Sequence, residues 1–243
     1  MPLVFSPLTE AILDTPPKRL FPKHAFVMRQ LGRPPAIDLA MARIVESVLK
    51  KRGFRTKDAD ASTGGKDFLE RILELIRATG FTVAIFSDKT RPTALANIML
   101  ELGFAAMCGK PLLIVKSAKA RAPSDFSRTD WISYDGTDER RFRSKLNQGL
   151  DAIESLTEYE DTLLSVALSA QAMDCAVAFE RANKGFLLSG EANFIEAAKL
   201  IHNRLREAQG SSGIADVERL AHEVEAFVLQ AQKSGSGKRR RSK

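Results

Sequence analysis

The chain has 243 residues, of which 44% are hydrophobic and 28% charged, the proportions of an ordinary soluble globular protein. This length suffices for one large or two modest domains. The formal net charge of +7 comes mostly from residues 238–243, which carry five basic side chains; without them 32 basic residues face 30 acidic ones, a balance of +2.

Several classes of protein are excluded by what the sequence lacks. Met1–Leu13 has no charged segment followed by a long apolar run, and no later run approaches the length of a membrane span. Cys108 and Cys175 occur in helix-like segments, where reduced and buried thiols are expected. The three histidines show no ligand spacing. We therefore expect a cytoplasmic protein with no membrane contact and no metal site.

The first third of the chain predicts an irregular arm followed by alternating strands and helices. Five prolines interrupt the first 23 residues, so residues 1–21 are expected to be irregular. The apolar patterns then predict a strand at 24–28, a loop at 29–35, a helix at 37–51, a strand at 54–57 and a helix at 66–78. The last helix has an apolar face formed by Phe68, Ile72, Leu75 and Ile76.

The middle of the chain predicts a strand, a crossover helix and a second parallel strand. The apolar runs Thr82–Phe86 and Leu112–Val115 flank a helical segment at 95–105, and a further strand is expected at Trp131–Tyr134 before a helix at 137–156. A stripe at helical spacing is expected to face the sheet: Leu95, Ile98, Met99, Leu102 and Ala106.

Alternation of this kind predicts an α/β fold with a parallel sheet and right-handed crossovers. Five strands favour the flavodoxin-like order 2-1-3-4-5, in which the topological switch point lies between strands 1 and 3. That order brings the loop Arg29–Pro35 against the loop Ser87–Ala96 and Glu101. Open α/β sheets bind ligands at such a point. The α/β domain is expected to span residues 22–156.

Residues 157–233 contain helix-forming residues and no strand signal. Three helices are expected, at Tyr159–Asn183, Glu191–Gln209 and Ile214–Gln232, with breaks at Lys184-Gly185, Ser189-Gly190 and Gly210–Gly213. The apolar surface of the first helix predicts a bundle or an interface, hence a homo-oligomer or a protein partner bound through the C-terminal helices. Residues 234–243 are expected to be a disordered basic tail that contacts nucleic acid weakly and without sequence preference.

One set of motifs resembles a known family. In order, the chain has Phe26-Val27-Met28-Arg29, Asp58-Ala59-Asp60, Ser87-Asp88, and Asn97-Ile98-Met99-Leu100-Glu101-Leu102-Gly103-Phe104-Ala105 followed by Gly109-Lys110-Pro111. Over residues 22–136 this pattern is similar to the nucleoside 2-deoxyribosyltransferase-like group, which is similar in fold to TIR domains.

The resemblance implies an enzyme that cleaves the N-glycosidic bond of a nucleotide, with NAD favoured as substrate rather than bound as a cofactor. It also implies a role in bacterial stress or antiviral defence. Thr93-Ala94-Leu95-Ala96 departs from the Asn-Pro-rich segment that relatives often show there, and residues 29–35 lack the small-residue loop of active deoxyribosyltransferases. Both departures leave the substrate class open. They weigh more against transfer, the activity of the alternative nucleoside 2-deoxyribosyltransferase, than against hydrolysis.

Candidate site residues follow from chemistry at this switch point. Glu101 is the candidate catalytic carboxylate, because an anion can stabilise or capture the oxocarbenium-like cation formed when a ribosyl bond breaks; otherwise it is a solvated helix residue. Asp88 and Asp60 are candidates to bind ribose or base, or to act as a general acid if their pKa is raised. Their alternative is a turn or cap role. Asn97 shares the helix face of Glu101.

Two arginines of the first loop are candidates to bind a phosphate. Arg29 and Arg33 flank that loop, and backbone amides of the loop and the helix start are suited to anions. A solvated arginine, or one packed against Asp38, is the alternative. The chain has no Walker loop and no Rossmann fingerprint, so no bound cofactor is expected. A rival reading makes the α/β domain a non-catalytic module that senses a nucleotide while the helices recruit a partner.

Overall fold

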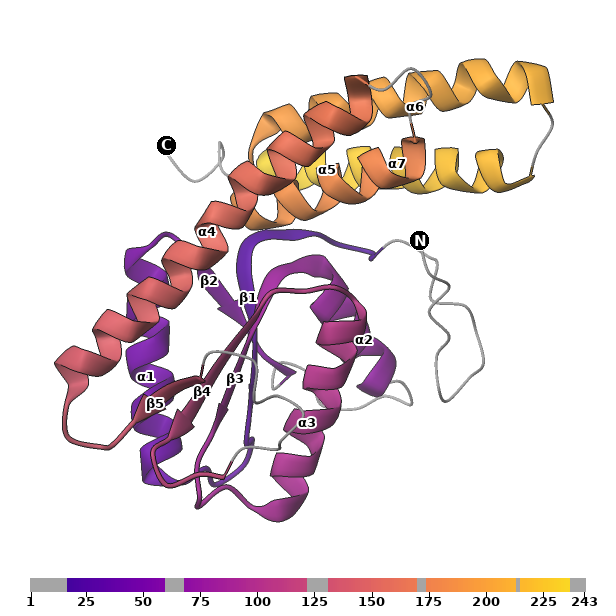
Figure 1. The fold of residues 1–243 in the computed structure, drawn as a ribbon. Coiled ribbons are helices and arrows are strands. Elements are labelled where there is room, and N and C mark those ends of the chain that lie inside the picture. Colours follow the sequence, from indigo (N-terminus) through magenta and orange to yellow (C-terminus); the bar gives the residue numbers. More distant parts are fainter. Residues whose placement is uncertain (1–16, 60–67, 122–130, 170–173, 213–214, 237–243) are drawn as a thin grey trace. The chain divides into compact units, whose positions relative to one another are not determined.

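A computed structural model describes residues 17–59, 68–121, 131–169, 174–212 and 215–236 of the chain. Strands and helices alternate as far as β4, β5 is the next described element after it, and helices follow from there to the end of the described chain (Figure 1). The elements are β1 (Phe21–Arg29), α1 (Ala36–Lys51), β2 (Arg55–Lys57), α2 (Phe68–Ala78), β3 (Thr79–Phe86), α3 (Pro92–Met107), β4 (Leu112–Ser117), β5 (Trp131–Tyr134), α4 (Glu139–Ser169), α5 (Cys175–Ser189), α6 (Ala192–Ser212) and α7 (Ala215–Ser236).

The five strands form one parallel sheet in the order β2-β1-β3-β4-β5, which confirms the expected fold class. Val83 of β3 pairs with Leu113 of β4, and Val115 of β4 pairs with Ile132 of β5. Helices α2 and α3 cover one face of the sheet, and α1 with the first part of α4 covers the other (Figure 1). Because the crossovers change direction after β2, the switch point lies between β1 and β3.

Strand β3 lies at the centre of this unit, and every one of its residues is buried. Such a continuous apolar run is what a strand covered on both faces requires. On the α3 side its alternate residues join a cluster with Ile98 and Leu102, as the apolar stripe predicted. The expected contact of Ala106 is wrong: Ala105 is buried in its place and Ala106 is exposed.

The turn after α3 contains the Gly-Lys-Pro segment of the family resemblance, and its lysine has a structural role. Lys110 Nζ donates to the carbonyls of Arg77 (2.9 Å) and Thr79 (2.6 Å), at the junction of α2 and β3. The Pro111 carbonyl accepts the amide of Thr82 (3.0 Å). A cation that binds the last carbonyls of a helix satisfies groups that lack an intrahelical partner.

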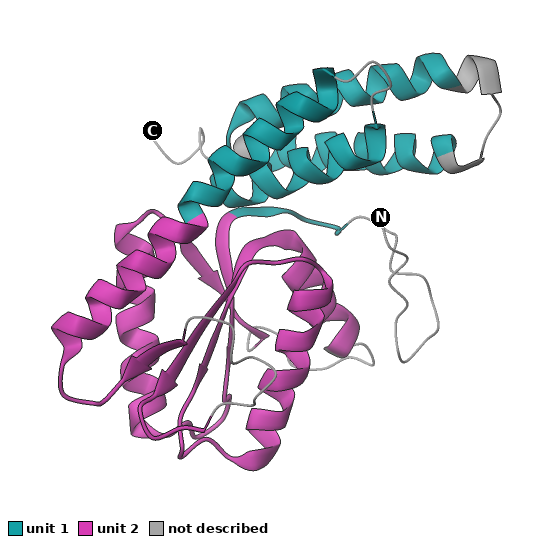
Figure 2. Cartoon of the chain, in the orientation of Figure 1, with its two compact units in different colours: residues 1–22, 154–243 teal, residues 23–153 magenta. Residues whose placement is uncertain are grey.

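The contacts within the chain divide it into two compact units, residues 23–153 and residues 1–22 with 154–243 (Figure 2). The division falls inside α4, a single helix that continues past residue 157 to Ser169. The helix expected at Tyr159–Asn183 is therefore wrong, because its two parts belong to α4 and α5. Helix α5 has its own N-cap, Asp174, whose Oδ1 accepts the amides of Ala176 (3.0 Å) and Val177 (3.1 Å).

The expected break at Lys184-Gly185 is also wrong, since α5 runs on to Ser189. Gly185 is instead a packing residue: a Cβ built on it would lie 2.2 Å from the ring of Phe194. The break at Gly190 is confirmed. This glycine has φ +70° and its amide donates to the carbonyl of Phe186 (2.7 Å), an arrangement that ends a helix.

The helical unit has an apolar core of its own, in which Phe179 and Phe186 pack edge-on against Phe227. All described residues beyond 157 that belong to a regular element are helical, as expected. Helix α7 extends to Ser236, so the first three residues of the expected disordered tail, 234–236, are helical. The rest of that tail lies outside the described residues. None of the described helices combines the length and apolar character needed to cross a bilayer.

Candidate functional site

The loops that follow β1 and β3 meet at the switch point, as the strand order predicts. Gln30, only 2% exposed, joins them: its Oε1 accepts the amide of Arg91 (2.9 Å) and its Nε2 donates to the carbonyl of Arg33 (2.8 Å). Arg91 Nη2 donates in turn to the carbonyls of Leu31 (3.2 Å) and Gly32 (3.0 Å). The carbonyls of Leu31 and Gly32 in the first loop are thus bound by Arg91 of the second.

The loop after β1 has an unusual backbone conformation. Gly32 (φ +61°) and Arg33 (φ +52°) are both left-handed, and for the arginine this costs on the order of 1–2 kcal/mol. Helix α1 begins directly afterwards, and Pro35 at its N-cap supplies no side-chain cap. Amides of the first turn are therefore available to an anion.

The two candidate phosphate-binding arginines differ in their surroundings. Arg29 Nη2 pairs with Asp58 Oδ2 at 3.2 Å, so its charge is partly matched. The side chain of Arg33 is exposed and has no hydrogen bond or ion pair with the described part of the chain. The alternative in which Arg33 packs on Asp38 is not what the structure shows, because Asp38 accepts the hydroxyl of Thr90 instead. Of the two, Arg33 is the one whose guanidinium group has no partner among the described residues.

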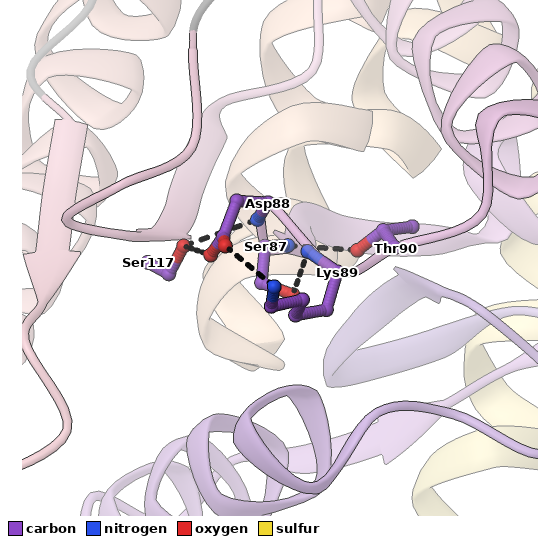
Figure 3. A network of polar contacts seen from close by, with 5 residues as sticks. All are labelled: Ser87, Asp88, Lys89, Thr90 and Ser117. Carbon is purple, nitrogen blue, oxygen red and sulfur yellow. Dashed lines mark hydrogen bonds and ion pairs between the residues drawn. The ribbon is translucent and has the colours of Figure 1, made fainter.

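Asp88 is held at the carboxyl end of β3 by Ser117 from β4 (Figure 3). The Ser117 hydroxyl donates to Asp88 Oδ1 (2.9 Å) and accepts the amide of Asp88 (3.2 Å), while Lys89 Nζ lies 3.8 Å from Asp88 Oδ2. The hydrogen bond from Ser117 lowers the pKa of Asp88, against a smaller opposing effect of burial. An ionised carboxylate accepts hydrogen bonds and cannot donate a proton, so Asp88 does not fit the general-acid role considered for it.

Glu101 lies on α3 beside the buried stripe and is partly buried. Burial removes water from its carboxyl group and raises its pKa to about 7. The carboxyl group of Glu101 has no hydrogen bond or ion pair with the residues described. An isolated carboxyl group whose pKa is shifted by burial is typical of functional positions, although structural sites also produce such shifts.

Helix α3 packs against α2. Cys108 lies seven residues, close to two turns, after Glu101 and so projects from the same side. Burial raises the pKa of the Cys108 thiol, and the charges of Lys110 and of Arg77 on α2 lower it in part, so Cys108 lies near the end of α2. Glu101 is nine residues beyond Pro92, about 13 Å along the helix axis. That it faces a cleft bordered by residues 29–35 and 87–92 stays a prediction.

The structure says less about the two remaining candidate site residues, Asn97 and Asp60. Asn97 is exposed one turn before Glu101 and has no hydrogen bond to the described residues. Asp60 lies outside them. No group of three or more histidine, cysteine, aspartate or glutamate residues suited to a metal ion occurs in the described segments.

Sequence reasoning missed four polar residues of this site: Gln30, Asp38, Thr90 and Ser117. Gln30 and Ser117 are polar residues at the carboxyl ends of buried strands, which is a signal that could have identified them. Asp38 and Thr90 gave no such signal. Their contact joins residues 52 positions apart in the chain, and only the fold reveals it.

Comparison with known proteins adds little at the level of sequence. The chain matches no protein-family model, and a search of curated proteins found no match. Among solved structures it is similar to the Clostridium botulinum CMP N-glycosidase BcmB, with a TM-score of 0.36 and 16% sequence identity. The match covers 51% of this chain and 98% of that one. A likeness at this distance does not assign a function.

Proposed function

We propose that the α/β unit hydrolyses the bond between the ribosyl group and the base of a nucleotide, with NAD as the favoured substrate. The observation that carries this proposal is Glu101: a partly buried carboxyl group with a pKa of about 7, without a partner among the described residues, on the helix that follows the switch-point loop. A carboxylate in a water-poor environment interacts strongly with a developing cation, because little solvent screens the charge.

In the proposed reaction, water attacks C1′ of the ribose as the bond from C1′ to the base nitrogen breaks. The ribose passes through an oxocarbenium-like state, which the ionised Glu101 stabilises. The electron pair of the broken bond stays on the base, the oxygen of water becomes the new hydroxyl group on C1′, and one proton is released. Only the ionised form of Glu101 can act in this way, so the rate is expected to rise with pH through about 7 and then level off.

NAD is favoured because of how its base leaves. Nicotinamide is attached as a cationic pyridinium, and the electron pair it receives makes it neutral, so no general acid is needed. This suits a site in which Asp88 is held ionised by Ser117. We assign Asp88 to the ribose hydroxyl groups and Arg33 with the start of α1 to the phosphates.

The test is to incubate the purified protein with NAD, CMP, deoxynucleosides and deoxynucleotides at pH 8 and to measure released base by chromatography. The proposal expects base release from a nucleotide, most rapidly nicotinamide from NAD. Exposed Glu70 of α2 provides a matched control, since Glu70→Gln changes the charge on the neighbouring helix without touching the site. Nucleotide binding without release of any base would favour the sensing module instead.

A further inference from the structure

Asp38 and Thr90 form a contact that the proposed chemistry does not use. Asp38 belongs to the first turn of α1 and is 2% exposed; Thr90 belongs to the loop after β3 and is 7% exposed. The Thr90 hydroxyl donates its single proton to Asp38 Oδ2 at 2.8 Å. Hydrogen bonds to a charged acceptor are about twice as strong as those between neutral groups, so this contact is a firm link between two elements.

The same hydroxyl organises the loop after β3 from inside. Thr90 Oγ1 accepts the amide of Ser87 at 2.7 Å, and the Thr90 amide donates to the Ser87 carbonyl at 3.2 Å. Ser87 Oγ accepts the amide of Lys89 at 3.1 Å (Figure 3). Asp88, which lies between these residues, is thereby fixed in the turn, and its carboxylate can meet Ser117.

The geometry points to Asp38 and Thr90 as a positioning pair that anchors the Ser87–Arg91 loop to the start of α1 and so holds Asp88 at the nucleotide site. This inference rests on the proposed function for its effect on substrate, but the anchoring itself is independent of it. A second connection, from Gln30 to the Arg91 amide, joins the loop after β1 to the same loop after β3. The loop that contains Asp88 is thus fixed both to the start of α1 and to the loop that contains Arg33.

Only one of the two carboxylate oxygens of Asp38 has a hydrogen bond, which is not expected of a residue with a purely structural role. Its Oδ1 is buried and has no hydrogen bond from the described residues. A buried, half-satisfied carboxylate is destabilising, whereas an asparagine at this place could still accept the Thr90 hydroxyl. Buried polar groups that lack a hydrogen bond are found more often at functional sites than elsewhere.

Two variants of Thr90 test the pair. Thr90→Val keeps the shape and removes the hydroxyl, and Thr90→Ser keeps the hydroxyl and serves as the conservative variant. Thr90→Val is expected to raise KM for the substrate about 10-fold or more with a smaller change in kcat, because Asp88 loses its fixed place while Glu101 does not; Thr90→Ser should restore KM to within about threefold.

Because Thr90→Val leaves Asp38 charged and unpaired, the variant could be too unstable to assay. The double variant Asp38→Asn with Thr90→Val removes that charge, so stability should recover while the KM defect persists. If the double variant regains both the wild-type melting temperature and the wild-type KM, the pair has only a structural role and the inference is overturned.

Hydrogen exchange of single backbone amides gives a readout that does not depend on activity. The amides of Ser87 and Lys89 are expected to exchange at least 10-fold faster in the double variant than in wild type, and at the wild-type rate in Thr90→Ser. Unchanged exchange in the double variant would overturn the anchoring. If wild type releases no base from any nucleotide, the proposed function fails, and this measurement still decides the positioning claim.

Discussion

Replacing Glu101 by Gln is expected to change the stability of the α/β unit in a pH-dependent way. The substitution keeps the size and nearly the helix propensity of the side chain, so at pH 5, where the folded-state carboxyl group is protonated, its effect should stay within about 1 kcal/mol. The folded-state pKa of about 7 lies above the ordinary value of 4.5. Between these two values the folded state keeps a proton that the unfolded state has lost, so wild type loses stability as pH rises through this window.

The difference between a pKa of 4.5 in the unfolded state and about 7 in the folded state corresponds to about 3 kcal/mol in the free energy of unfolding. Between pH 5 and pH 8.5 the free energy of unfolding of Glu101→Gln should therefore gain on the order of 2–3 kcal/mol relative to wild type. The single tryptophan of the chain, Trp131, lies in β5, so its fluorescence reports unfolding of the α/β unit in urea. Glu70→Gln is the control, because Glu70 remains in water when the chain folds. A stability difference between Glu101→Gln and wild type that stays constant with pH would refute the burial of this carboxyl group.

Three further predictions concern the other parts of the chain. Gly185→Ala should lower the free energy of unfolding of the helical unit by about 1–3 kcal/mol, because the new methyl group meets the buried ring of Phe194. Gly103→Ala adds a methyl group in open space on α3 and should raise the free energy of unfolding of the α/β unit by roughly 0.5–1 kcal/mol. Urea unfolding followed by circular dichroism compares the two variants, and equal effects would contradict the packing of Gly185 against Phe194. Deleting residues 237–243 should leave the melting temperature unchanged but weaken salt-sensitive retention on a polyanion column, and a large fall in melting temperature would show that the tail supports the fold. Light scattering at high concentration should show self-association through the helical unit, and a strictly monomeric chain would count against that prediction.

The sheet was predictable because its signals are local. Apolar runs such as Thr82–Phe86, separated by helix-length segments, indicate both the number of strands and the parallel arrangement. The strand order 2-1-3-4-5 is favoured because it is a common order for a doubly wound sheet of five strands. The helical unit is harder to divide from its sequence, because the glycines at 185 and 190 have different roles. Glycine ends a helix at Gly190, where φ is positive, but at Gly185 it allows close approach of Phe194. Sequence alone does not separate these two uses.

The candidate site was predictable in outline and not in its contacts. The switch-point rule correctly placed the loops of Arg33 and Asp88 together, but it could not reveal that Arg29 pairs with Asp58 or that Ser117 lowers the pKa of Asp88. These depend on contacts 29 positions apart in the chain. The raised pKa of Glu101 likewise depends on how deeply α3 buries it, which no pattern in the sequence expresses.

The rate of base release by Glu101→Gln, relative to wild type at pH 8 on the best nucleotide substrate, tests the central proposal most directly. Gln keeps the shape of the side chain and removes the charge that meets the developing cation, so the rate should fall about 100- to 1,000-fold while nucleotide binding survives. The same measurement on Glu70→Gln should match wild type. Base release by Glu101→Gln at the wild-type rate would contradict the assignment of Glu101 as the catalytic carboxylate.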